Sequence, residues 1–113
     1  MTRSAHEADR ETRHPAVVTC PRTGAQALFL NPIYTTRLDG LTEEESLTEE
    51  ESAPILAALS AHATRPDISC RLRWRVGDVA IRDNRLTLHY ATNDYDGRRR
   101  LLTRTTFAGA PPA

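Results

Sequence analysis

The fold of this chain is decided by residues 83–106, which read DNRLTLHYATNDYDGRRRLLTRTT. Over residues 86–91 apolar and polar side chains alternate with a period of two, so the leucines share one face of a predicted strand and His89 lies on the other. A turn-rich connection follows at residues 93–97. The second predicted strand, residues 99–107, places Arg100 and Arg104 on one face, roughly 13 Å apart.

One histidine and two arginines suit a metal ion and an anion. Neutral imidazole is a ligand for Fe(II) and similar cations, and the planar guanidinium forms two parallel hydrogen bonds with a carboxylate. Arginines on one strand face have a second interpretation, an exposed sheet edge that carries charge to prevent pairing. Taken without further context, the arginine pair favours that second interpretation.

The stretch resembles the C-terminal signature of the taurine dioxygenase (TauD/TfdA) family of iron(II)- and 2-oxoglutarate-dependent dioxygenases. The residues that match are Asp83-Asn84-Arg85, Thr87, His89-Tyr90-Ala91, Asn93-Asp94-Tyr95 and Arg99-Arg100. The resemblance implies that His89 is the distal iron ligand and that Arg100, 11 residues later, holds the distal carboxylate of 2-oxoglutarate. It also implies that Arg104, 15 residues after the histidine, meets an anionic group of the cosubstrate or substrate.

The resemblance extends over about residues 14–109. It implies a mainly β fold with one helix, the C-terminal part of a double-stranded β-helix or jelly roll. Residues 1–13 are then expected to be a flexible leader and residues 110–113 a tail. Tyr34 falls where the family carries an aromatic residue near the substrate, although a core or rim tyrosine is an equally good interpretation.

An internal repeat precedes the single predicted helix: residues 41–46, LTEEES, recur as residues 47–52. Each copy has the Thr-x-x-Glu spacing of a helix capping box. Because Pro54 inside a helix would cost about 3 kcal/mol, we expect the regular helix to start near Ser52. The expected buried stripe of this helix consists of Ile55, Leu56, Leu59 and His62. Further strands are expected at residues 16–20, 25–31, 68–74 and 79–81.

The iron site that the resemblance implies is incomplete in this sequence. A facial triad needs two histidines and a carboxylate, and the family takes the first histidine and the carboxylate from an upstream His-x-Asp motif. The nearest candidate, His6-Glu7-Ala8-Asp9, has one residue too many, and we expect it to be part of a solvated leader. The sequence therefore predicts a C-terminal fragment of a dioxygenase that lacks the His-x-Asp ligands and is inactive alone.

The implied reaction of the whole enzyme is hydroxylation of a small anionic substrate, of the sulfonate or alkyl sulfate class, with Fe(II) as the metal and 2-oxoglutarate as cosubstrate. Three positions depart from the family: Arg82 replaces Trp, Leu88 replaces Gln and Thr103 replaces His. These departures keep two alternatives open. The chain is a half-subunit completed by another chain, or it is a non-catalytic interaction module on a remnant fold.

Composition limits the remaining classes. The chain has 113 residues, 39% of them hydrophobic, and a formal net charge of zero, so nothing favours a nucleic acid or a membrane surface as partner. No apolar run reaches the roughly 20 residues of a membrane span. Cys20 and Cys70 make no metal motif and are expected to be reduced thiols in a cytoplasmic protein. A half jelly roll leaves strand edges uncovered, so we expect a homo-oligomer or a complementing N-terminal half as partner.

Overall fold

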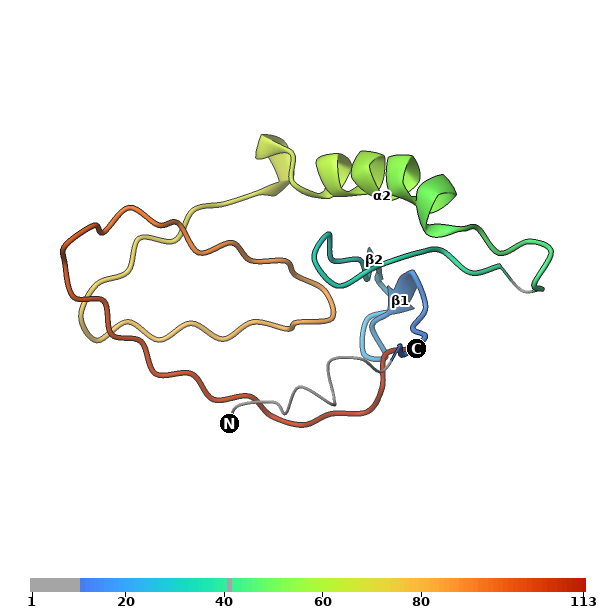
Figure 1. Ribbon diagram of the computed structural model, residues 1–113. Helices are drawn as coiled ribbons and strands as arrows, with labels where there is room; N and C mark the ends of the chain where they lie inside the picture. The colour runs from blue at the N-terminus through green and yellow to red at the C-terminus, as the bar shows by residue number, and fades with distance from the viewer. Residues whose placement is uncertain (1–10, 41) are drawn as a thin grey trace.

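The computed structural model describes residues 11–40 and 42–113, and it contains few regular elements. In chain order they are strand β1 (Val17–Thr19), strand β2 (Gln26–Leu28), helix α2 (Glu49–Ala63) and the short 3-10 helix η1 (Pro66–Ile68). The hairpin and the helix lie at one end of the molecule, and the chain after η1 sweeps away in wide loops before it returns to β1 (Figure 1). The described residues are therefore mostly non-helical, with one α-helix and one two-stranded sheet. The His6–Asp9 motif lies outside them.

Strands β1 and β2 form an antiparallel hairpin in which Val18 is paired with Ala27. The turn between them closes where the Gly24 amide donates to the Cys20 carbonyl at 2.8 Å, and Gly24 has a φ of 71°, which glycine adopts at no steric cost. Val18, only 2% exposed, and Leu30, 8% exposed, are the buried apolar side chains of the described residues. The two strands expected near residues 16–31 are thus confirmed, each shorter than predicted.

Helix α2 begins earlier than the sequence predicts. Its N-cap is Thr48, whose hydroxyl accepts the Glu51 amide at 3.2 Å while the Glu51 carboxylate accepts the Thr48 amide at 2.9 Å. Three glutamates in the first turn stabilise the helix by their interaction with the positive end of the helix dipole. The expected start near Ser52 is wrong because this capping box and dipole interaction offset the loss at Pro54, which lies inside the helix.

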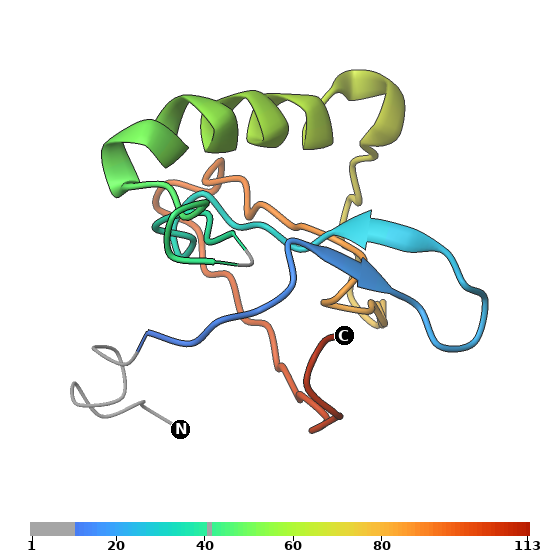
Figure 2. The same ribbon diagram turned by 90° about the vertical axis from the view of Figure 1, so that its right-hand side faces the viewer.

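The buried face of α2 also differs from the prediction. Ser52 is fully buried, and its hydroxyl accepts the Leu38 amide at 2.9 Å, which fastens the first turns of the helix to the segment before it. Leu56 and Leu59 follow Ser52 at helical spacing and are half-buried, whereas Ile55 and His62 are exposed. The predicted stripe is therefore right at Leu56 and Leu59 and wrong at Ile55 and His62, because the inward face of the helix is the one that carries the anchored Ser52. Figure 2 shows α2 lying across from the β1–β2 hairpin.

The chain after η1 forms none of the predicted strands. Among residues 70–113 the backbone hydrogen bonds close local turns at residues 75–78, 83–87 and 95–98, and the Ala113 carbonyl accepts the Thr19 amide at 2.9 Å. The alternating segments run extended without a hydrogen-bonded neighbour, so their apolar faces are open to solvent. Large apolar side chains at least 85% exposed there are Val76, Val79, Ile81, Tyr90 and Phe107. A period of two is therefore present without the ladder that makes a strand.

The molecule is expanded for its length. The Cα radius of gyration is 16.8 Å, against the roughly 13 Å that a compact domain of this size adopts. Among the helices of the described residues, none combines the length and apolar character needed to cross a membrane.

Candidate metal and anion site

The predicted ligand His89 follows a tight turn built on Asp83. The Asp83 carboxylate accepts the Arg85 amide at 2.9 Å and the Arg85 guanidinium at 2.8 and 3.0 Å. The Asp83 carbonyl accepts the amides of Leu86 and Thr87 at 3.2 and 3.1 Å and the Thr87 hydroxyl at 2.7 Å. Hydrogen bonds from the Arg85 side chain and backbone hold the pKa of Asp83 below its usual value. The turn reverses the chain and brings residues on its two sides together.

His89 meets Arg82 across this turn. Arg82 Nη2 lies 3.2 Å from His89 Nε2, and Arg82 Nε donates to Asn84 Oδ1 at 3.3 Å. Both side chains are exposed. A guanidinium has only N–H donors, so the imidazole nitrogen accepts.

The two predicted anion-binding arginines lie on the open loops. The Arg100 guanidinium stacks over the Tyr95 ring with its carbon 5.3 Å from the ring centre, a cation–π contact. Arg104 is exposed. Among the described residues no hydrogen bond or ring contact joins His89, Arg100 and Arg104 to one another. Tyr34, predicted near the substrate, is 80% exposed.

The residues that the structure describes hold no group of three or more histidine, cysteine, aspartate or glutamate side chains that could bind a metal ion. The His89 nitrogen is moreover occupied by a hydrogen bond from a cation. The side chains of residues 11–40 and 42–113 by themselves therefore do not supply the three ligands that an iron ion needs.

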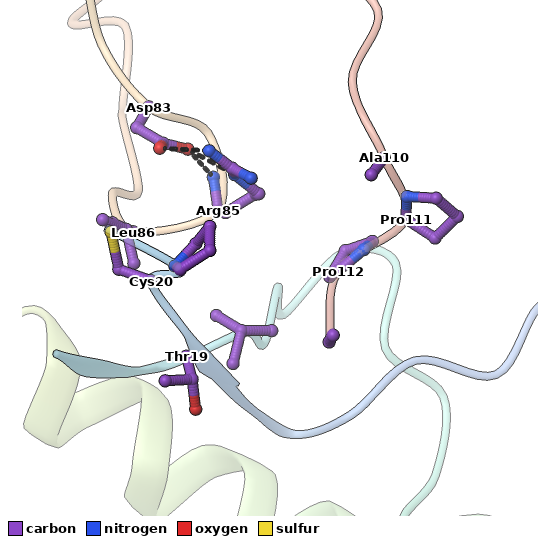
Figure 3. A pocket seen from close by; sticks show the side chains of 11 residues that line it. Thr19, Cys20, Asp83, Arg85, Leu86, Ala110, Pro111 and Pro112 are labelled. Carbon is purple, nitrogen blue, oxygen red and sulfur yellow. Dashed lines mark hydrogen bonds and ion pairs between the residues drawn. The ribbon is translucent and has the colours of Figure 1, made fainter. Parts of the chain in front are cut away.

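A cavity of about 190 Å³ lies where β1, the Asp83 turn and the C-terminal residues meet (Figure 3). Cys20, Asp83, Arg85 and Pro111 are among its lining residues. Hydrogen bonds from the Thr23 side chain and from the turn backbone lower the pKa of the Cys20 thiol, and the charge of Arg85 contributes in the same direction. Sequence reasoning missed this cavity, because its walls are far apart in the chain and share no motif.

A second cavity, of about 270 Å³, separates α2 from the segment before it. It is lined by Leu30, Asn31, Pro32, Thr35, Thr36, Ala53, Leu56, Ala57 and Ser60. His89, Arg100, Arg104 and Tyr34 line neither of these two cavities.

The sequence model of the taurine catabolism dioxygenase TauD, TfdA family matches residues 1–106. The chain belongs to the TauD/TfdA family. Its relatives include an alkylsulfatase of Acinetobacter baylyi, 39% identical over 99 residues, which are 88% of this chain and 29% of the relative. An alpha-ketoglutarate-dependent sulfate ester dioxygenase of Pseudomonas putida is 41% identical over 102 residues, 90% of this chain and 32% of that protein.

A third relative is a putative alpha-ketoglutarate-dependent sulfonate dioxygenase of Schizosaccharomyces pombe, 35% identical over 100 residues, 88% of this chain and 24% of the relative. This TauD/TfdA chain thus spans 24–32% of the length of these curated relatives. The names of several relatives specify alpha-ketoglutarate, which is 2-oxoglutarate, as the molecule on which their reaction depends. Family membership is therefore shown for nearly the whole chain, over a minor part of the relatives.

Proposed function

We propose that this chain is the C-terminal part of an Fe(II)- and 2-oxoglutarate-dependent dioxygenase that hydroxylates a small anionic substrate of the alkyl sulfate or sulfonate class. The observation that carries the proposal is the match of residues 1–106 to the TauD/TfdA family, with His89, Arg100 and Arg104 in the family's register. The sulfate ester and sulfonate dioxygenases among the relatives support this substrate class. In the complete protein the segments after η1 form part of a jelly roll.

Each site residue has a separate task in this proposal. His89 supplies one iron ligand, and Arg100 binds the distal carboxylate of 2-oxoglutarate through two parallel charge-assisted hydrogen bonds. Arg104, four residues further along the same predicted strand face, neutralises the anionic group of the substrate or the keto-acid end of the cosubstrate. Tyr34 contributes to the substrate side of the pocket. In the free chain the Arg100 guanidinium lies over the Tyr95 ring in a cation–π contact.

A second polypeptide segment that carries His-x-Asp completes the iron site, and the chain alone is inactive. Two observations support this part of the proposal. The chain spans only 29% and 32% of two of its relatives, and the described residues contain no cluster of three metal-binding side chains. The exposed extended segments after η1 favour completion by another chain, because unpaired backbone and apolar faces such as Ile81 and Phe107 gain hydrogen bonds and cover from added strands.

The second candidate function, a non-catalytic interaction module, is favoured by the hydrogen bond between Arg82 and His89. In that case His89 holds no iron under any condition. The two candidates differ in what happens when the missing ligands are supplied.

The test is co-expression of this chain with the part of the Pseudomonas putida relative that the chain does not cover. Succinate formed from 2-oxoglutarate with a sulfate ester is measured for the chain alone, for the pair and for the pair with His89→Ala. We expect no succinate from the chain alone, succinate from the pair, and a loss of at least about a hundredfold with His89→Ala, since a metal ligand is removed. Succinate from the chain alone would refute the inactive-fragment proposal, and an associated pair that is inactive would favour the interaction module.

A further inference from the structure

The hydrogen bond between Arg82 and His89 has a consequence for the chain before any second segment joins it. His89 Nε2 lies 3.2 Å from Arg82 Nη2, and the guanidinium can only donate. A neutral imidazole has one nitrogen with a lone pair and one with a proton. If Nε2 accepts from Arg82, then the proton is on Nδ1, and the lone pair that a cation needs at Nε2 is already engaged.

We propose that Arg82 is a cap on His89: it holds the imidazole in its Nδ1–H tautomer and keeps divalent cations off Nε2 in the chain by itself. The proposal deepens the proposed function and rests on it in treating His89 as a metal ligand. It adds a residue that controls when that ligand becomes available.

The geometry of the Asp83 turn carries the cap. Arg82 immediately precedes Asp83, and His89 follows the last hydrogen bonds of the turn, so the two side chains meet across it. Arg82 Nε also donates to Asn84 Oδ1 at 3.3 Å, which directs the guanidinium plane. The Asp83 carboxylate forms its ion pair with Arg85. It therefore does not pair with Arg82, whose positive charge stays beside His89. The contact is local, since it joins residues seven positions apart in the chain.

The positive charge of Arg82, like the engaged lone pair of His89, opposes the binding of a cation at Nε2. A guanidinium is permanently protonated, and a divalent cation at His89 Nε2 would stand beside it with no carboxylate between them. The described residues place no carboxylate in hydrogen-bond contact with Arg82 or His89. A polypeptide that brings His-x-Asp would supply such a carboxylate, which can attract Arg82 away from the imidazole and offset the positive charge at once. The cap therefore opens only for the segment that completes the site.

The test uses the full ¹⁵N-labelled chain, its Arg82→Met variant and, as matched control, Arg73→Met, which removes another exposed arginine of the same extended region. Long-range ¹H–¹⁵N spectra at a pH where imidazole is neutral report which ring nitrogen of His89 carries the proton. His89→Gln identifies the signal. Titration with Co(II) alone then measures binding at His89 from the loss of its ring signals, with His14 and His62 as internal references.

We expect His89 to be protonated on Nδ1 in the parent chain and in Arg73→Met, and on Nε2 predominantly in Arg82→Met. We expect Co(II) to bind His89 about tenfold more tightly in Arg82→Met, with no change at His14 and His62. A parent His89 protonated on Nε2, or an Arg82→Met chain with unchanged tautomer or unchanged Co(II) affinity, would overturn the cap. The measurement uses neither 2-oxoglutarate nor a second polypeptide, so its failure is distinct from failure of the proposed dioxygenase function.

Discussion

At the scale of single residues, the hairpin turn at residues 21–24 changes the chemistry of the thiol before it. The Thr23 hydroxyl and the backbone amides of Arg22 and Thr23 donate to Cys20, and these hydrogen bonds favour the thiolate. Arg85, which lines the same 190 Å³ cavity as Cys20, adds a positive charge. The pKa of Cys20 is therefore lowered, and the thiol is half-buried rather than sealed from solvent.

Substitution of Thr23 by Val should slow alkylation of Cys20 at neutral pH by about threefold. The side-chain hydrogen bond is the largest cause of the lowered pKa, so its loss raises that pKa and moves the rise of the rate to higher pH. The rate is followed by mass spectrometry with iodoacetamide between pH 6 and 10. Cys70, exposed in the same chain, is the internal control. Identical pH profiles for Cys20 in the parent and in Thr23→Val would contradict this expectation.

The sequence predicts part of this chemistry of single residues, and the rest needs the structure. The Pro21–Gly24 turn was predictable, because proline and glycine restrict the backbone in the way a turn requires. The approach of Arg85 to Cys20 was not, since the two are far apart in the chain and no motif links them. The role of Arg82 was predictable only as a departure from the family pattern. Its partner, His89 Nε2, required the geometry of the Asp83 turn.

At the scale of elements, the repeated LTEEES segment gives a direct comparison of two identical helix starts. In both copies the threonine amide donates to the glutamate three residues later, Thr42 to Glu45 at 3.3 Å and Thr48 to Glu51 at 2.9 Å. Only the second copy continues into a helix, and its serine is buried while the serine of the first copy, Ser46, is half-buried. The Thr-x-x-Glu spacing alone therefore does not start a helix. In the second copy the Glu51 amide donates to the Thr48 hydroxyl and completes the capping box, whereas in the first copy the Glu45 amide donates to the Thr42 backbone carbonyl at 3.3 Å.

Thr48→Ala should destabilise α2 by about 1 kcal/mol, because the Glu51 amide loses its hydroxyl acceptor. Thr42→Ala, at the same place in the first copy, should lower the stability of α2 by less than half of that amount. Both are measured as helical far-UV circular dichroism against temperature. Equal losses in the two variants would show that the second copy is not the functional cap.

The strands were predictable only where their partner is close in sequence. The hairpin of β1 and β2 formed as expected, since a short turn joins the two halves of its ladder. For residues 68–107 the sequence has a period of two, but periodicity does not identify a hydrogen-bonding neighbour. The described residues provide none for these segments, and they remain extended and exposed.

At the scale of the whole molecule, expansion and exposed apolar surface belong together. A radius of gyration of 16.8 Å accompanies open loops on which Val76, Ile81 and Phe107 face solvent. Such a surface is typical of a chain that gains its remaining strand pairing from a partner. The expected partner, a complementing N-terminal half or a second copy of the chain, stays a prediction. The family, in contrast, was predicted from residues 83–106 and is confirmed by the match over residues 1–106.

The measurement that tests the central claim most directly is the affinity of the completed pair for 2-oxoglutarate, compared between Arg100→Met and Arg99→Met. The two arginines are adjacent and both exposed, so they match in charge and exposure, and only Arg100 has the register of the carboxylate ligand. We predict that Arg100→Met weakens 2-oxoglutarate binding by about tenfold to a hundredfold, as expected for the loss of a bidentate charge-assisted contact, and that Arg99→Met changes it less than about threefold. Equal affinities for the two variants would contradict the claim that these residues belong to a cosubstrate pocket.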